Sequence, residues 1–239
     1  MGTSATLPKP GTKVARQGFW LLPSLRRPGN VARIARSYVD TEATGRVILR
    51  LHKGDPTLPE YEKLDLPETW DVHVGPECAA AGAMRWAFDR WPNEDFYGFL
   101  GDDIILQTPG WDLSLSNGAG RWGNAYPDDG IQGRNLATHP TVGGDLVRAL
   151  GWWALPGVIH CFVDTALMYV AQRIGTLRYY PGVKFDHLHP IVGRGANDEV
   201  YQKGMSTFRK DMAKFNQWVN SSGTEKRLKR LERKVGTLV

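Results

Sequence analysis

A chain of 239 residues with 41% hydrophobic and 23% charged residues has the composition of a globular protein with one sizeable core or two small ones, which excludes a disordered tail. Its two cysteines exclude a disulfide framework and favour a reducing compartment. The longest nearly apolar stretch, residues 151–163, is too short to cross a membrane and is interrupted by Pro156 and His160. We therefore expect a cytoplasmic protein that does not insert into membranes.

The net charge of +5 is unevenly distributed along the chain. Residues 1–36 carry +7, residues 224–239 carry +4, and the residues between these segments carry −6. An acidic centre fits a body that binds a cation, and basic ends could contact a polyanion. Solvated basic termini are the alternative interpretation of the same pattern.

Strand and helix patterns alternate in the first half of the chain, after a loose leader over residues 1–16 that shows no periodicity. Short apolar or alternating runs predict strands, and apolar residues at helical spacing predict helices. The order indicates an α/β domain over residues 17–220, with helices flanking a mixed central sheet. The expected elements are strands over 18–22, 46–51, 96–100 and 104–106, and helices over 31–38 and 77–91.

The second half predicts a helix over 160–174 and one or two strands over 177–189, broken at Pro181. A last long helix carries an apolar seam that must pack on the body or on a partner. The residues of this seam are Tyr201, Met205, Phe208, Met212, Phe215 and Val219.

A separate basic amphipathic helix is expected over residues 224–239. Its apolar residues are Leu228, Leu231, Val235 and Leu238. Sixteen residues cannot hold a helix alone in water. Four interpretations therefore stay open: the helix docks on the body, forms a homo-oligomer as a short coiled coil, folds on an anionic partner, or frays.

Two adjacent acids, Asp102 and Asp103, follow the predicted strand over 96–100. Neighbouring carboxylates at the carboxyl end of a strand repel each other unless a cation or hydrogen-bond donors offset the repulsion. Mg²⁺ and Mn²⁺ prefer oxygen ligands and commonly share their coordination sphere between carboxylates and substrate phosphates. The pair therefore predicts a divalent-metal site, with a simple turn as the alternative.

The segment 185–190, Phe-Asp-His-Leu-His-Pro, places His187 and His189 on one face of an extended strand. Either or both imidazoles could bind a metal or a phosphate, although an isolated histidine is more often structural. Because the available ligands are carboxylates and imidazoles, a cysteine-rich structural zinc site is excluded.

Other candidate residues lie near predicted strand and helix ends. The segment 23–28, Pro-Ser-Leu-Arg-Arg-Pro, and Asp55 follow the first two strands, where the loops of open α/β sheets line a nucleotide crevice. Asp164 lies in the first turn of a predicted helix, as a cap or as a general base. A further acidic turn, Asp128 and Asp129, could face the site or only shape a loop, and we favour the loop.

Taken in order, these residues resemble a GT-A glycosyltransferase, in particular the small family 2-like enzymes of bacteria and their phages, over nearly the whole body. The segment 22–28 resembles the donor loop of such enzymes, and the segment 101–104, Gly-Asp-Asp-Ile, resembles their metal-binding Asp-x-Asp motif. Asp164 is similar to their catalytic base, and the segment 187–189 with Asp198 is similar to a closing segment in which a His completes the metal site.

The resemblance implies a GT-A (Rossmann-like) fold with C-terminal helices, and an enzyme that moves a hexosyl or pentosyl group from a nucleoside-diphosphate sugar to a hydroxyl with inversion. Asp164 would deprotonate the acceptor. The ligands of Mn²⁺ or Mg²⁺ would be Asp102, Asp103, His187 and His189. The resemblance leaves open which of the two histidines binds the metal. The donor would contact Pro23, Ser24, Arg27, Asp55 and Asp102.

Two departures from the family pattern concern this site. His52-Lys53-Gly54 stands before Asp55, where relatives tend to show an acidic run. Asp164 lacks the preceding acid of the commonest Glu-Asp form.

Several acceptors and activities remain open at this stage. Basic ends and the aromatic residues Trp122, Trp152 and Trp153 favour a hydroxymethylated base in DNA as acceptor, in the host cytoplasm if a phage encodes the protein. A saccharide acceptor is the alternative.

A nucleotidyltransferase and a non-catalytic nucleic-acid-binding module are rival functions. The absence of GxGxxG, P-loop and Gly-x-Ser-x-Gly motifs argues against dinucleotide redox enzymes, P-loop kinases and common serine hydrolases.

Overall fold

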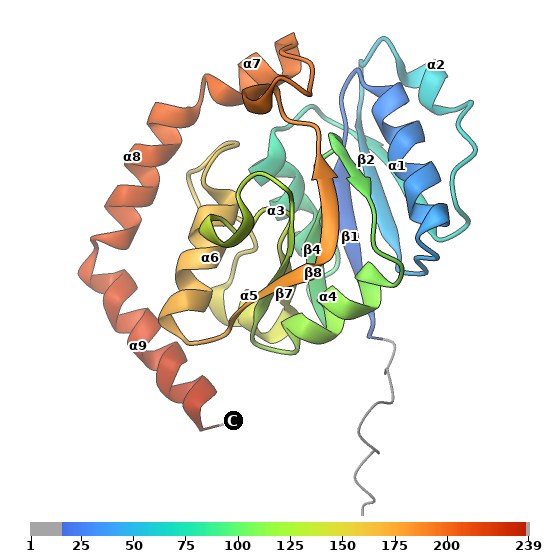
Figure 1. Ribbon diagram of the computed structural model, residues 1–239. Coiled ribbons are helices and arrows are strands. Elements are labelled where there is room, and N and C mark those ends of the chain that lie inside the picture. The colour runs from blue at the N-terminus through green and yellow to red at the C-terminus, as the bar shows by residue number, and fades with distance from the viewer. Residues whose placement is uncertain (1–15, 238–239) are drawn as a thin grey trace, which may run out of the picture.

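The computed structural model describes residues 16–237 and has one mixed sheet at its centre (Figure 1). Its strands are β1 (Gly18–Pro23), β2 (Val47–His52), β3 (Trp70–Gly75), β4 (Phe96–Phe99), β5 (Ile104–Leu106), β6 (Asn124–Asp128), β7 (Thr141–Gly143) and β8 (Leu177–His187). They lie in the order β3-β2-β1-β4-β7-β6-β8-β5. Except for residue 16, the expected leader lies outside the described residues.

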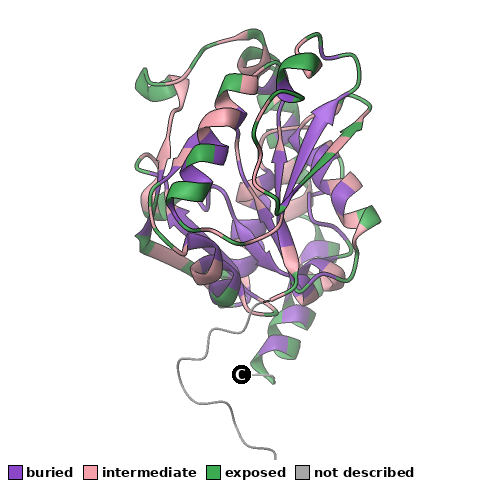
Figure 2. Cartoon of the chain, turned by 90° about the vertical axis from the view of Figure 1, so that its right-hand side faces the viewer, coloured by how far each residue is buried: buried purple, intermediate pink, exposed green. Residues whose placement is uncertain are grey.

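Helices cover both faces of this sheet. They are α1 (Pro28–Asp40), α2 (Leu58–Tyr61), α3 (Ala80–Arg90), α4 (Trp111–Ala119), α5 (Gly144–Leu150), α6 (Val163–Arg173), α7 (Glu199–Met205), α8 (Phe208–Val219) and α9 (Ser222–Gly236), with short 3₁₀ turns η1 (Gly133–Asn135) and η2 (Pro190–Val192). Figure 2 shows the buried strands in the middle and exposed residues on the outer helix faces. This is the α/β architecture that the alternation of patterns predicted.

The two faces of β1 show why the sheet needs cover on both sides. Phe19 and Leu21 point into one apolar core, and Trp20 and Leu22 point into the other. All four are at most 1% exposed. Because successive side chains of a strand alternate between faces, a strand that is apolar throughout is stable only between two layers.

The strand pairing brings the predicted site segments to one edge. β1 pairs in parallel with β2 on one side and with β4 on the other. The loops after these three strands therefore leave the sheet at the same edge, which is the usual position of ligands in open α/β folds. This edge is called the site end below.

The sequence patterns missed several elements. β3 was not predicted, and no element was predicted between residues 107 and 159, where the structure has α4, β6, β7 and α5. The long helix expected over 201–219 is two helices, α7 and α8. The helix is interrupted at Thr207, whose backbone N–H and hydroxyl both donate hydrogen bonds to the carbonyl of Gly204. Part of the seam remains exposed: Met205, Phe208 and Met212 are 38–42% exposed.

The basic C-terminal helix docks on the body of its own chain. Leu228, Leu231 and Val235 of α9 are at most 5% exposed and belong to the larger core cluster. Leu238 lies outside the described residues. Of the four interpretations, docking is the one observed, and the three leucine and valine side chains are not available for a coiled coil. Within residues 16–237 we find no helix with the length and apolarity needed to span a membrane.

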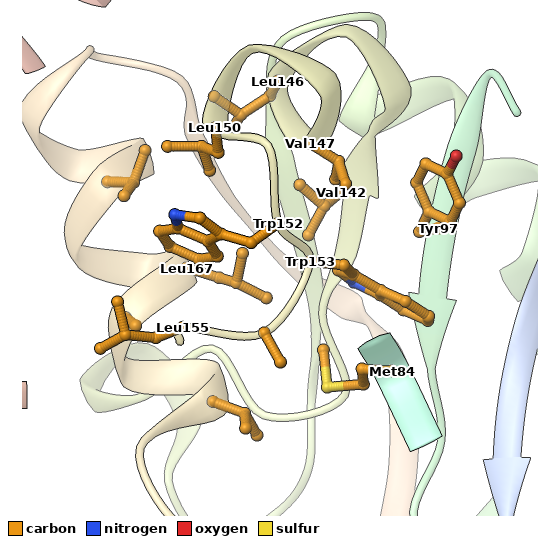
Figure 3. Packing of buried hydrophobic residues seen from close by; sticks show 14 of the residues in the cluster. Met84, Tyr97, Val142, Leu146, Val147, Leu150, Trp152, Trp153, Leu155 and Leu167 are labelled. Carbon is orange, nitrogen blue, oxygen red and sulfur yellow. The ribbon is translucent and has the colours of Figure 1, made fainter. Parts of the chain in front are cut away.

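Two of the tryptophans expected near an acceptor are core residues. Trp153 is fully buried against Tyr97 and Met84, and Trp152 packs near Leu150 and Leu167 (Figure 3). Neither indole is available to stack on a substrate.

Candidate active site

The acidic pair at the end of β4 divides between two environments. Asp102 is buried and its two oxygens accept hydrogen bonds from Ser24 Oγ and from an Arg27 amino group, both at 2.8 Å. Asp103 turns the other way, and its Oδ2 lies 3.5 Å from Nε2 of His187. The two residues form a turn between β4 and β5, and their side chains serve two different neighbourhoods.

Asp102 belongs to the loop that follows β1. Ser24, which donates to it, also lies 2.9 Å from the hydroxyl of Tyr61, and that hydroxyl accepts a hydrogen bond from the Arg27 backbone N–H. Burial raises the pKa of Asp102 to about 6, even though the Arg27 guanidinium opposes the shift. Desolvation of the carboxylate therefore outweighs its ion pair.

Arg27 connects this loop to the C-terminal part of the chain. Its guanidinium donates in bidentate fashion to Asp198, at 2.8 and 2.5 Å, while its third nitrogen binds Asp102. Asp198 is also the N-cap of α7 and accepts from the Tyr201 backbone N–H at 2.9 Å. Arg26–Glu199 and Lys203–Glu77 add two exposed ion pairs. The segment that begins α7 is thus tied to the loops after β1 and β3.

Backbone pairing brings His187 to Asp103. β5 and β8 are antiparallel with Ile104 opposite His187, and the Leu188 N–H donates to the Asp103 carbonyl at 2.7 Å. Residues 84 positions apart along the chain therefore become neighbours through one short ladder.

Three imidazoles gather at this point. The rings of His187 and His189 are 5.0 Å apart, as their alternate spacing in a strand predicts, and His139 lies 4.9 Å from His187 on the other side. Burial disfavours the charged forms of Asp103 and His187. The hydrogen bond and the attraction between them nevertheless lower the pKa of Asp103 to about 2. The same contact, together with Asp129, raises the pKa of His187 to about 9. Burial lowers the pKa of His139 to about 3.

His139 was not recognised from the sequence, which shows it only as a single histidine. Its Nδ1 accepts from the Gly101 N–H at 3.2 Å, and its Nε2 is buried with no partner among the described residues. Its φ of 51° lies in the left-handed region, which a non-glycine residue adopts at some energetic cost. Strain of this kind is common beside functional sites.

Asp129 corrects our interpretation of the acidic turn as a loop-shaping element alone. Its side chain is 1% exposed, and its Oδ2 lies 3.1 Å from Nδ1 of His187. Its neighbour Asp128 instead pairs with Lys184 at the surface. Only the tertiary contact distinguishes the two acids, since both precede the same glycine in sequence.

Asp164 and Asp55 occupy the positions expected from the sequence, at the start of α6 and after β2. Asp164 Oδ1 accepts from the backbone N–H of Thr165 at 2.7 Å, and burial, with a smaller contribution from the nearby Asp129 carboxylate, raises its pKa. Asp55 is buried, and its oxygens accept from the N–H groups of Arg26 and Thr57. Asp55 therefore shapes the loop after β1.

A second buried acid, Asp211 of α8, holds the segment that precedes Asp164. Its oxygens accept from the backbone N–H groups of Ile159, His160 and Cys161, each at 2.9 Å. Sequence analysis did not single out this residue. The contact fixes the approach of α6 to the site end.

Arg27 and Asp103 also line a pocket of about 240 Å³. It is lined on one side by Arg27, Asn30, Arg33 and Asp103, and on the other by Leu188, Pro190, Arg194, Gly195, Ala196 and Tyr201. Guanidinium groups predominate, which suits an anionic ligand. Within the described part of the chain, no three His, Cys, Asp or Glu side chains are close enough together to hold a metal ion.

Neither a protein-family model nor a curated protein sequence matches this chain, whereas many solved structures do. A mannosyltransferase from Pyrobaculum calidifontis, solved with GDP-Man and Mn²⁺, superposes with a TM-score of 0.65 and 8% identity, over 92% of this chain and 69% of its own. The chain has the GT-A fold. Glucosyl-3-phosphoglycerate synthase from Mycobacterium tuberculosis, solved with Mn²⁺ and UDP, gives a TM-score of 0.57 and 14% identity, covering 87% and 85%.

These structural superpositions establish the fold expected from the resemblance. GT-A architecture places the carboxyl ends of β1, β2 and β4 at the ligand-binding edge, and this is where the acids, imidazoles and arginines described above are found. The comparisons assign no role to individual residues of this chain.

Proposed function

We propose that this protein is a metal-dependent glycosyltransferase that moves a sugar from a nucleoside diphosphate to an acceptor hydroxyl. The observation that carries the proposal is the facing pair of Asp103 and His187, 3.5 Å apart at the ligand-binding edge of a GT-A fold. The mannosyltransferase and the synthase that share this fold were solved with Mn²⁺ and a nucleotide or nucleotide sugar.

The side chains at the site end suit a hard divalent cation. Two ligands at right angles on a six-coordinate Mg²⁺ are about 3 Å apart, close to the observed separation of the carboxylate and imidazole. A site with fewer than three protein ligands leaves positions for diphosphate oxygens, as Mg²⁺ commonly requires. Asp103 and His187 would hold the ion, with His189 adjacent. When bound, Mn²⁺ or Mg²⁺ supplies Lewis-acid stabilisation of the leaving diphosphate.

Asp102 is assigned to the donor rather than to the metal, because both of its oxygens face the loop after β1. With Pro23 and Ser24 it forms the wall against which a ribose would lie, and Asp55 supports that wall by holding the Arg26 backbone. Arg27 is the group best placed to bind phosphate, and it would exchange Asp198 for the donor. Ligand pockets usually measure about 300–1,000 Å³, so the smaller pocket seen here requires the α7 segment to shift.

Asp164 is the candidate general base. Burial raises its pKa toward the range in which a carboxylate accepts a proton efficiently near neutral pH. In a single displacement it would take the proton of the acceptor hydroxyl as the oxygen attacks the anomeric carbon. The anomeric configuration would then be inverted.

The acceptor class is a choice between a saccharide and a hydroxymethylated base in DNA. The basic helix α9 lies at the end of the sheet opposite the site (Figure 1), and Trp152 and Trp153 are core residues, so neither supports a DNA acceptor. Basic residues at the site end, Arg26 and Arg33, are the remaining support for a polyanion. We therefore propose a saccharide first and a modified base second.

A donor screen tests the transferase proposal. Each nucleotide sugar is added with and without Mn²⁺, and thermal stability and slow donor hydrolysis are measured. A true donor raises the melting temperature only with metal, because ligands that bind the folded state stabilise it by mass action. Release of pyrophosphate from a nucleoside triphosphate would instead indicate a nucleotidyltransferase. Metal-independent binding without hydrolysis of any donor would indicate a non-catalytic module.

The acceptor is tested with the donor so identified. Transfer to oligosaccharides is compared with transfer to duplex DNA containing hydroxymethylcytosine or hydroxymethyluracil. A DNA acceptor predicts binding that weakens steeply with salt, because phosphate contacts release counterions. Salt-independent binding would exclude it.

A further inference from the structure

Four donors hold the buried carboxylate of Asp129 in one orientation. Its Oδ1 accepts from the backbone N–H groups of Ile131, Gln132 and Gly133, at 3.1, 2.7 and 3.2 Å. Its Oδ2 lies 3.1 Å from Nδ1 of His187. A carboxylate with 1% exposure and this many donors cannot turn away without leaving buried N–H groups unsatisfied.

When the His187 ring is neutral, this contact determines which of its nitrogens carries the proton. An ionised carboxylate only accepts, so Nδ1 must donate, and in the neutral imidazole the lone pair is then on Nε2. Nε2 is the nitrogen that faces Asp103 Oδ2. A metal ligand needs a lone pair, so the orientation of His187 suits a cation between these two atoms.

We propose that Asp129 is a positioning residue that fixes the ring and the tautomer of His187, so that Nε2 presents its lone pair to a divalent cation shared with Asp103. The inference rests on the proposed metal-dependent function. Asp129 touches neither the cation nor the donor and acts through His187. Histidine ligands of metals commonly donate their second N–H to a carboxylate, which fixes the tautomer and makes the ligand more basic.

Asp129→Asn separates this role from a structural one. The asparagine retains an oxygen for the three backbone N–H groups, but its amide NH₂ would face His187 Nδ1 as a donor. Nδ1 must then accept, and the proton moves to Nε2, where it blocks the lone pair. The ¹⁵N shifts of the His187 ring, recorded without metal under conditions in which the imidazole is neutral, report the tautomer directly. We expect Nδ1–H in the wild type and Nε2–H in the variant.

Mn²⁺ binding to the full chain, followed through the free-ion EPR signal without donor, gives the second readout. Loss of a carboxylate behind a histidine ligand typically weakens metal binding about 10–100-fold, and we expect a decrease in that range. Asp128→Asn is the matched control: it removes one charge from the same turn, but from a surface pair with Lys184. It should change neither the tautomer nor the affinity.

The outcomes distinguish the inference from the proposed function. An Nε2–H tautomer in the wild type overturns the inference, even if Asp129→Asn does not fold. Unchanged tautomer and Mn²⁺ affinity in a folded Asp129→Asn overturn it as well, and leave the metal site intact. If the tautomer changes but the wild type binds no Mn²⁺, Asp129 positions His187 as argued, and the metal-dependent function fails instead.

Discussion

The two ends of the central sheet each hold an aspartate that is paired with arginine, but in different surroundings. At the site end, Asp102 is paired with Arg27, whose side chain is only 15% exposed and is shared with Asp198. At the opposite end, Asp145 is paired with Arg148 and with Arg121, whose side chain is 76% exposed. Burial raises the pKa of Asp102 to about 6, whereas the two arginines lower that of Asp145 despite some burial.

The difference shows what an ion pair can compensate. Burial also disfavours the charged form of Asp145, but hydrogen bonds from two arginines outweigh that loss of solvation. A buried carboxylate that shares its guanidinium with a second carboxylate loses more solvation free energy than its ion pair returns. Its negative charge therefore lowers the stability of the folded protein. Such a cost is typical of groups retained for binding, which supports our proposal that the site end is the functional end.

The largest expected effect that tests this comparison is on catalysis. Asp103→Asn removes a charged ligand of the proposed cation, and we expect Mn²⁺-dependent donor hydrolysis to fall by about 100-fold or more, because the metal contributes several kcal/mol of transition-state stabilisation. Asp145→Asn makes the same substitution at the opposite end and should leave the rate within about twofold of wild type. Equal losses in the two variants would contradict a functional difference between the ends.

The next effect concerns stability at the opposite end. Leu231→Ala removes a side chain of α9 that is 5% exposed in the core, and should lower the free energy of unfolding by about 2–4 kcal/mol. Urea denaturation measures this loss, and Mn²⁺ affinity should not change. Lys229→Ala, on the exposed face of the same helix, should cost no more than about 0.5 kcal/mol. Similar small values for both variants would mean that α9 does not dock in solution.

The smallest effect is a difference in pH dependence. The folded-state pKa of Asp102, about 6, exceeds its unfolded value of 3.8, so folded protein retains a proton that unfolded protein releases, and stability falls as pH rises from about 4 to 6. Asp102→Asn removes this titration. Between pH 4 and 7 the metal-free variant should gain about 2 kcal/mol relative to wild type.

Asp145→Asn should show the opposite sign. The pKa of Asp145 is lowered in the folded state, so its contribution is present above the unfolded pKa and is lost as pH falls through the folded value. The variant should be less stable than wild type at pH 7 and approach it in acid. Denaturation at several pH values checks both slopes, and parallel slopes would refute the contrast between the ends.

The sequence alone determined the local features of this protein. The alternating and helical patterns of residues 18–106 predicted the strands and helices that build β1, α1, β2, α3, β4 and β5, because both periodicities follow from backbone geometry. The Asp102–Asp103 pair and the common face of His187 and His189 could be predicted for the same reason. The missed elements between residues 107 and 159 have short or weakly periodic patterns.

Only the tertiary structure decided which of these features meet. The antiparallel pairing of Ile104 with His187, the contact of Asp129 with that histidine and the docking of α9 all join residues far apart in the chain. Local patterns do not encode such pairings, because they depend on which surfaces remain to be buried once the sheet has formed. For this reason Asp128 and Asp129 are equivalent in sequence, while in the fold one is a surface charge and the other is part of the site.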